Sequence, residues 1–265
     1  MSAIEPPLLM VFAEDRLSYR LAVELADRIF ETEHEAWWAA QEDWNGIKES
    51  VRVWGPIKPG HHKGERTTRG DLKREELRLT SIDVDDKMAA IMLKATKLAA
   101  IRARELKPRR AVLVAAIDSD GLEHRRAAFQ KVLSTEKQLL AALAIPHPES
   151  EAWVLSGFLP ENSVEAERLT RLTKQLRFDP TIDSHRLRST TSDERDTKRC
   201  FFFLAEGVLS ENNAKDKVAE EGGRGERCWL RTNLSTLETR GKQNGLVEYL
   251  NDVRLRLLPL LKSRG

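Results

Sequence analysis

The segment from Ala111 to Ile117 constrains the fold more than any other part of the sequence. It consists of seven consecutive apolar residues, AVLVAAI, and is followed at once by Asp118-Ser119-Asp120-Gly121. A short continuous apolar run of this kind is typical of a strand buried on both faces, as in a parallel sheet. The run from Leu8 to Ala13 has the same form and ends at Glu14. Together the two runs predict a parallel sheet covered by helices on both faces.

The patterns around these two runs complete an α/β alternation. Apolar residues recur at helical spacing after each run and also between residues 88 and 107. Residues 50–54 alternate in polarity and stop at Gly55-Pro56, which predicts a second strand. The expected helices cover residues 18–30, 88–107 and 123–143, and the remaining expected strands cover residues 50–54 and 144–145.

The chain is expected to divide near residue 160. Residues 1–160 carry the strand-helix alternation, with an insertion at about 58–78 that has a local excess of basic residues and no core-forming residue before Leu72. Residues 161–265 show helical spacing interrupted by polar stretches. The predicted fold is therefore α/β, with a four-stranded parallel sheet flanked by helices and a C-terminal α-helical extension.

Composition limits the classes of function. Of the 265 residues 40% are hydrophobic and 32% charged, which is typical of a globular protein. No apolar run approaches the ~18 residues needed to span a bilayer, so a membrane partner is not expected. Two cysteines without a CxxC pair, behind an N-terminus that lacks a signal-peptide pattern, favour the cytoplasm. The net charge of +2 does not by itself indicate nucleic-acid binding, which depends on clustered Lys and Arg.

Acidic residues follow both of the clearest strands. In an open parallel sheet the carboxyl ends of the strands form the ligand-binding edge, so Glu14 and Asp118 are expected to lie near each other. Asp118 and Asp120, two residues apart, would share a face. Converging carboxylates repel one another unless a cation lies between them, and Mg²⁺ prefers such oxygen ligands. The alternative is that Asp118 to Gly121 form only a turn and a helix N-cap.

Three segments resemble the TOPRIM fold of topoisomerases, bacterial primases, recombination-repair proteins and OLD-family nucleases. VFAEDRLSYRLAVEL at 11–25 is similar to the glutamate motif of this family, and VLVAAIDSDG at 112–121 is similar to its DxD motif. AIPHPESEAWVLSGFL at 144–159 resembles small TOPRIM-like proteins of bacterial gene clusters. The resemblance covers about residues 8–160. It departs from the family at Asp15, where many members have glycine after the glutamate.

The resemblance implies a metal site and a reaction. Asp118 and Asp120 would hold Mg²⁺ or Mn²⁺, and Glu14 would be a further ligand or the general acid or base. Glu149 and Glu151 would support a second metal, although first-turn glutamates also simply favour a helix N-terminus. The implied function is a metal-dependent nuclease acting on DNA or RNA in bacterial defence.

The resemblance also implies partners. Small proteins of this kind often act beside an ATPase encoded next to them, so an ATPase partner is expected, and a homo-oligomer is compatible with the sequence. The alternative function is a non-catalytic TOPRIM-fold subunit that binds nucleic acid or serves as an adaptor in a larger complex. The balanced charge favours this alternative, whereas the retained glutamate and aspartates favour the enzyme.

Two basic segments are candidates for contact with nucleic-acid phosphates. Lys63, Arg66 and Arg69 lie in the insertion, which is either a phosphate-gripping loop or ordinary solvated surface. The tract from Arg186 to Arg199 mixes five basic residues with acidic ones, which favours a solvated helix face. Within that tract Lys198 and Arg199 are the second candidates for phosphate contact.

Overall fold

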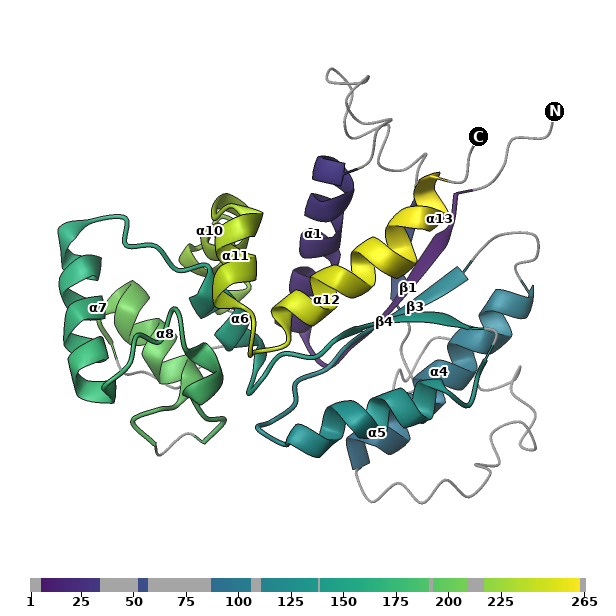
Figure 1. Cartoon of the computed structure of the whole chain (residues 1–265), viewed down its shortest axis with the longest axis horizontal. Coiled ribbons are helices and arrows are strands. Elements are labelled where there is room, and N and C mark those ends of the chain that lie inside the picture. The colour runs from purple at the N-terminus through teal and green to yellow at the C-terminus, as the bar shows by residue number, and fades with distance from the viewer. Residues whose placement is uncertain are drawn as a thin grey trace.

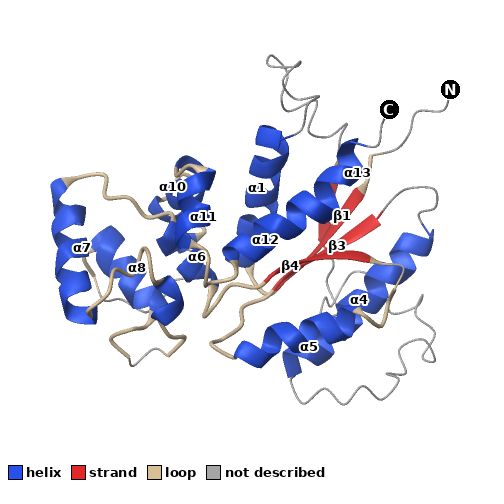
Figure 2. Ribbon diagram, in the orientation of Figure 1, coloured by secondary structure: helices blue, strands red, loops and turns tan. Residues whose placement is uncertain are grey.

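The fold is a four-stranded parallel sheet flanked by helices. The computed structural model describes residues 6–33, 52–56, 87–105, 111–137, 139–190, 193–208 and 217–262. The strands are β1 (Leu8–Ala13), β2 (Val53–Pro56), β3 (Ala111–Ala116) and β4 (Leu140–Ala144), in the order β2-β1-β3-β4 and all parallel. Figure 2 draws them in red with helices on both sides. The predicted α/β class and parallel sheet are confirmed.

Side chains of β3 alternate between two apolar layers, as they must in a strand buried on both faces. Val112 and Val114 face the layer that contains α1 (Arg16–Glu33) and the C-terminal helices. Leu113 and Ala115 face the layer formed by α4 (Lys87–Glu105) and α5 (Glu123–Leu133). Figure 1 shows these two groups of helices on opposite sides of the sheet. Helices therefore exclude water from both faces of the central strands. Polar side chains that bind a ligand are expected at the carboxyl ends of these strands.

The rest of the described chain is mainly helical, as expected. Its elements are α6 (Ser150–Ser156), α7 (Ser163–Leu176), η1 (Ser184–Arg186), α8 (Thr197–Glu206), α10 (Arg224–Arg231), α11 (Leu234–Arg240), α12 (Leu246–Asp252), the π-helix η2 (Val253–Leu257) and α13 (Leu258–Lys262).

The C-terminal helices share one apolar layer with the sheet. Tyr249 of α12 stacks on Trp153 of α6, with ring centroids 5.6 Å apart, and donates a hydrogen bond of 2.5 Å to the backbone oxygen of Ala22 in α1. The layer takes residues from β1 through α13 and so crosses the predicted boundary near residue 160. The division into residues 1–160 and 161–265 stays a prediction.

The expected helix at 123–143 is wrong in its second half. α5 ends at Leu133, where Ser134 and Thr135 turn their hydroxyls back onto the carbonyls of Lys131 and Val132. Residues 140–144 form β4 instead. The run LAALA is too short and too uniformly apolar to show a period, and alanine favours helices, so tertiary pairing with β3 decides its conformation.

Two smaller expectations are also corrected. β2 begins at Val53 and includes Gly55 and Pro56, whereas the sequence predicts a strand that stops before them. Because β2 is the outermost described strand on its side, a proline without an N–H is tolerated there. The tract from Arg186 to Arg199 is not one helix face: α8 begins only at Thr197, and Arg188 pairs with Asp196 in an isolated parallel bridge.

The outer edge of β4 is closed by two side chains from the C-terminal helices. The N–H of Leu143 donates to Asp252 Oδ2 at 3.1 Å, and the carbonyl of Ala141 accepts from Arg256 Nη1 at 2.9 Å. Asp252 and Arg256 are also joined to each other by an ion pair of 3.1 Å. The two side chains thus occupy positions at which a fifth strand would pair.

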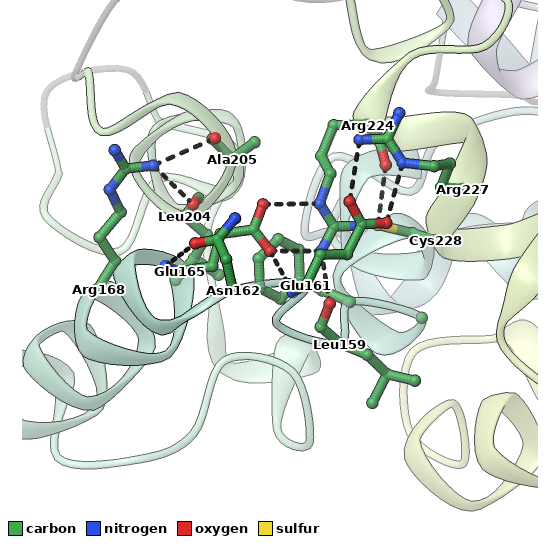
Figure 3. Close-up of polar contacts among 12 residues, drawn as sticks. Leu159, Glu161, Asn162, Glu165, Arg168, Leu204, Ala205, Arg224, Arg227 and Cys228 are labelled. Atoms are coloured by element: carbon green, nitrogen blue, oxygen red, sulfur yellow. Dashed lines mark hydrogen bonds and ion pairs between the residues drawn. The ribbon is translucent and has the colours of Figure 1, made fainter.

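A network of charged side chains joins α7 to α10. Arg224 donates through Nε and Nη2 to the two oxygens of Glu165, both at 2.9 Å (Figure 3). Its guanidinium lies 4.2 Å from the ring centre of Phe158. Glu165 is buried, whereas the neighbouring pair of Arg227 and Glu161 is partly exposed. Burial lowers the pKa of Arg224, but the hydrogen bonds to Glu165 and the nearby charges of Cys228, Glu165 and Glu161 together outweigh this effect, so its pKa is raised.

No helix in the described ranges is both long enough and apolar enough to cross a membrane.

Both cysteines are expected to be unreactive in the folded protein. Cys200 and Cys228 are free and buried, and desolvation raises the pKa of each thiol to about 12. Because only the thiolate attacks disulfide reagents, neither residue should react with such a reagent at pH 8 until the chain is unfolded. Their contribution to stability should fall above about pH 8.5, where the thiols of the unfolded chain begin to ionise. Thiol titration with and without denaturant tests this, and rapid native labelling would contradict it.

Candidate functional site

The ends of three neighbouring strands come together at one edge of the sheet. β1 and β3 pair in register, with Ala13 opposite Ala116, and the N–H of Glu14 donates to the carbonyl of Ala116 at 3.1 Å. On the other side of β3 the N–H of Ser119 donates to the carbonyl of Pro146 at 2.9 Å, two residues beyond β4. The structure therefore places Glu14 and Asp118 at adjacent strand ends, as the sequence predicts. Glu14 is exposed there.

The carboxylate of Asp118 is buried beneath this edge. Asp118 is 1% exposed, and its Oδ1 accepts a hydrogen bond of 2.5 Å from Ser150 Oγ at the start of α6. The Ser150 hydroxyl lies 2.9 Å from that of Ser18, which in turn donates to Asp15 Oδ1, also at 2.9 Å. A line of polar contacts thus connects the ends of β1, β3 and β4. Asp15 accepts from the N–H of Ser18 as well and thereby caps α1, which explains an acidic residue where glycine is common in the resembling family.

Asp120 lies in a turn whose backbone is left-handed. Its φ is 49° and that of Gly121 is 75°, a conformation that glycine adopts freely and aspartate tolerates. The Asp120 side chain is 43% exposed and accepts a bond of 2.5 Å from Arg125, which also donates to the carbonyl of Asp118 at 3.1 Å. Asp120 and Gly121 therefore form the expected turn. The capping reading is wrong, because the N-cap of α5 is Leu122 and no side chain caps it.

Glu149 and Glu151 stand at the start of α6, after β4. Glu149 is the N-cap residue and Glu151 lies in the first turn, and their exposures are 5% and 0%. Such burial sets them apart from ordinary first-turn glutamates, which usually remain in water. Lys198 of α8 donates to Glu149 Oε1 at 2.6 Å, so a cation from the C-terminal part of the chain reaches the edge of the sheet. Arg199 uses its N–H to bond Asp196 Oδ1 at 2.8 Å, at the start of α8.

A serine and a histidine beside the aspartates were not predicted. Ser119 Oγ lies 2.8 Å from His147 Nδ1. Burial lowers the pKa of His147, and nearby His185 lowers it further, against an opposing effect of Glu123. Their sequence signal is weak, because a lone Ser or His between other motifs is more often structural. The HPES stretch at 147–150 is the nearest thing to a signal, since it supplies three of the polar side chains at this edge.

The loop before α8 also borders the turn. Ser189 Oγ lies 3.9 Å from the position that a β-carbon on Gly121 would take. Segments from both sides of residue 160 therefore line this edge of the sheet, which the sequence did not decide.

Comparison with protein-family models, with curated proteins and with solved structures gave no match. The candidate site therefore rests on its own geometry. Among the described residues there is no group of three or more His, Cys, Asp or Glu side chains arranged to hold a metal ion. Carboxylate oxygens are nevertheless the right donor type for Mg²⁺ or Mn²⁺. Lys63, Arg66 and Arg69 lie outside the described residues.

Proposed function

We propose that the chain is a metal-dependent nuclease of TOPRIM type that hydrolyses phosphodiester bonds of DNA or RNA, with Mg²⁺ or Mn²⁺ as cofactor. The observation that supports this most is that acidic residues follow three adjacent strands of the sheet, Glu14 after β1, Asp118 after β3 and Glu149 after β4. Defence against phages or plasmids and an ATPase partner follow from the family resemblance and belong to the same proposal. A cytoplasmic location, which the two unpaired cysteines favour, also belongs to it.

The acidic residues offer the type of ligand atom that the cation needs, but the described side chains are not arranged around a common metal position. Oxygen ligands suit either cation, but Asp118 bonds Ser150 and Asp120 bonds Arg125. The described part of the chain therefore shows no finished three-ligand set. When bound, the cation would supply a charge that stabilises the developing negative charge on the phosphate. Asp118, Asp120 and Glu14 would hold it, with Glu149 and Glu151 available for a second ion.

The chain's own side chains have separate tasks under this proposal. Glu14 is exposed at the strand end, where a carboxylate can take a proton from an attacking water molecule or hydroxyl. Lys198 is paired with Glu149 and can move toward a substrate phosphate only by giving up that contact. Ser150 and Arg125 position Asp118 and Asp120 and would not touch the substrate.

A non-catalytic subunit is the second candidate. Asp118 and Asp120 are engaged with Ser150 and Arg125, as expected if the acidic residues only organise the ends of the strands. In that case the chain would bind nucleic acid or a protein partner through the same edge without cutting.

Metal binding and cleavage together decide between the two. The full chain should bind Mn²⁺ in calorimetry, cleave a labelled DNA or RNA in Mg²⁺ or Mn²⁺, with an ATPase partner added if needed, and stop in EDTA. Glu14→Gln should reduce cleavage by about a hundredfold or more, since it removes proton transfer or a ligand. Glu248→Gln, a change of the same kind on α12, is the control. If the protein is folded but shows no Mn²⁺ binding and no cleavage, the result favours the non-catalytic subunit.

A further inference from the structure

Helix α7 carries a row of basic residues that the proposed site does not use. The sequence RLTRLTKQLR places a cation at every third position, at 168, 171, 174 and 177, of which the last is the C-cap residue after α7. Positions three apart on an α-helix are neighbours, so the side chains of Arg168, Arg171 and Lys174 form an inclined row on α7, and Arg177 follows where the helix ends. Leu172 and Leu176 face the core instead.

The outer members of this row are open to solvent. Arg168 is turned inward and bonds the carbonyls of Leu204 and Ala205, whereas Arg171, Lys174 and Arg177 are exposed. Within the described ranges, no carboxylate lies at ion-pair distance from Lys174 or Arg177. Arg171 lies over the ring of Phe203, 5.7 Å from its centre. Exposed cations in a row without carboxylate partners are the usual footprint of a polyanion site.

The row ends at a pocket. Between the end of α7 and the loop before α8 lies a cavity of about 540 Å³, lined by Gln175, Leu176, Arg177, Thr190, Asp193, Glu194 and Arg195. Arg177 adopts a left-handed backbone, with φ of 62°, where α7 stops. Arg195 lies over the ring of Phe178, at 5.8 Å from its centre, on the same side of the molecule.

One of the two acidic residues of the pocket is already bonded within the loop. Asp193 accepts from Arg188 at 2.6 Å and from the N–H of Arg195 at 2.9 Å, and the second of these bonds is the main reason that its pKa is lowered. The negative charge of Asp193 is thus compensated by groups of the same loop. Glu194 is the other carboxylate of the lining and is exposed to solvent.

One short segment of the chain links the pocket to the candidate site. Ser189, which borders Gly121 after Asp120, directly precedes the pocket residue Thr190. On the other side of the loop, Lys198 bonds Glu149 at 2.6 Å. α7 and α8 pack together at one end of the molecule (Figure 1), and α8 also packs against α6, the helix that follows β4.

The geometry points to the pocket and the row Arg171, Lys174 and Arg177 as a binding site for the sugar-phosphate backbone of a nucleic-acid strand that continues toward Asp118. This rests on the proposed function, to which it adds the path of the substrate. The exposed Lys and Arg would contact phosphates, and specificity for sequence is not expected from such contacts.

Binding measured without metal tests this separately from cleavage. The probe is a fluorescein-labelled single-stranded 20-mer, as DNA and as RNA, titrated with the full chain in EDTA and followed by anisotropy. Lys174→Gln with Arg177→Gln should weaken binding by about tenfold. It should also reduce the slope of log affinity against log salt by roughly 1.4, the loss of two phosphate contacts on a single strand. The control is the double variant Lys131→Gln with Lys137→Gln, which removes the same charge at two exposed positions, one in the last turn of α5 and one shortly after that helix. It should change the affinity less than twofold.

Several outcomes would overturn the assignment. Equal losses in both double variants would mean that only net charge matters, and unchanged binding in the first would place the strand elsewhere. Displacement of the 20-mer by micromolar AMP or inorganic phosphate would indicate a small-anion pocket. Equally strong binding of polyglutamate would indicate an acidic protein partner. If the wild type binds as expected but does not cut in Mg²⁺ or Mn²⁺, the nuclease proposal fails while the binding site stands.

Discussion

Asp118→Asn should abolish nuclease activity while the protein stays folded. The change keeps an oxygen that can accept the hydrogen bond from Ser150, so the contact of 2.5 Å at the end of β3 should survive. It removes the charge required to hold a divalent cation, whose loss costs several kcal/mol of transition-state stabilisation and therefore a factor of about a hundred to a thousand in rate. The melting temperature should change by no more than a few degrees.

The matched control is Asp183→Asn, which removes an exposed carboxylate beside Arg186. It should retain full activity. Both variants are compared with the wild type by rate of cleavage and by thermal unfolding. A folded Asp118→Asn protein with full activity would move the active site elsewhere. Unfolding of that variant would mean that Asp118 has mainly a structural role at the strand end.

Arg224→Met should destabilise the protein more than any single change at an exposed ion pair. It strips the buried carboxylate of Glu165 of its bidentate partner, and such a loss typically costs 3–5 kcal/mol, or roughly 6–20 °C in melting temperature for a chain of this size. Changing Arg224 and Glu165 together to Met should cost less than the sum of the two single changes. Urea unfolding of the single and double variants measures this coupling.

Arg227→Met provides the comparison within the same network (Figure 3). Arg227 pairs with Glu161 at 2.9 Å, but the Glu161 side chain is 40% exposed, so water can replace the lost contact. Its loss should cost less than about 1 kcal/mol. Equal and small effects of Arg224→Met and Arg227→Met would show that burial of Glu165 adds nothing to the free energy of unfolding.

The sheet could be predicted where the sequence carries its own signal. β1 and β3 are continuous apolar runs, because strands covered on both faces need apolar side chains on both, and each run ends at an acidic residue. β4 has no such signal: LAALA suits a helix or a buried strand, and only its pairing with β3 decides. The sequence of the tract before α8 wrongly predicts a helix face, because its charged residues bond one another within a loop, as Asp193 does with Arg188.

The candidate site was predictable in its acidic residues and not in their surroundings. The position of Glu14 next to Asp118 follows from strand order and from ligand sites at strand ends. The hydroxyl of Ser150 on Asp118 and the guanidinium of Arg125 on Asp120 come from the packing of α6 and α5, which no local pattern encodes. Lys198 was predicted as a phosphate contact, but its bond to Glu149 brings together residues 49 positions apart.

The two side chains along β4 have a consequence for how this protein can associate with others. An open strand edge is a template onto which another chain can add a strand, in ordered dimers as well as in aggregates. Asp252 and Arg256 already bond the outward-facing N–H of Leu143 and carbonyl of Ala141. A second copy of the chain, or a partner, therefore cannot extend the sheet from β4 without displacing them, and must recognise this side of the molecule through its side chains.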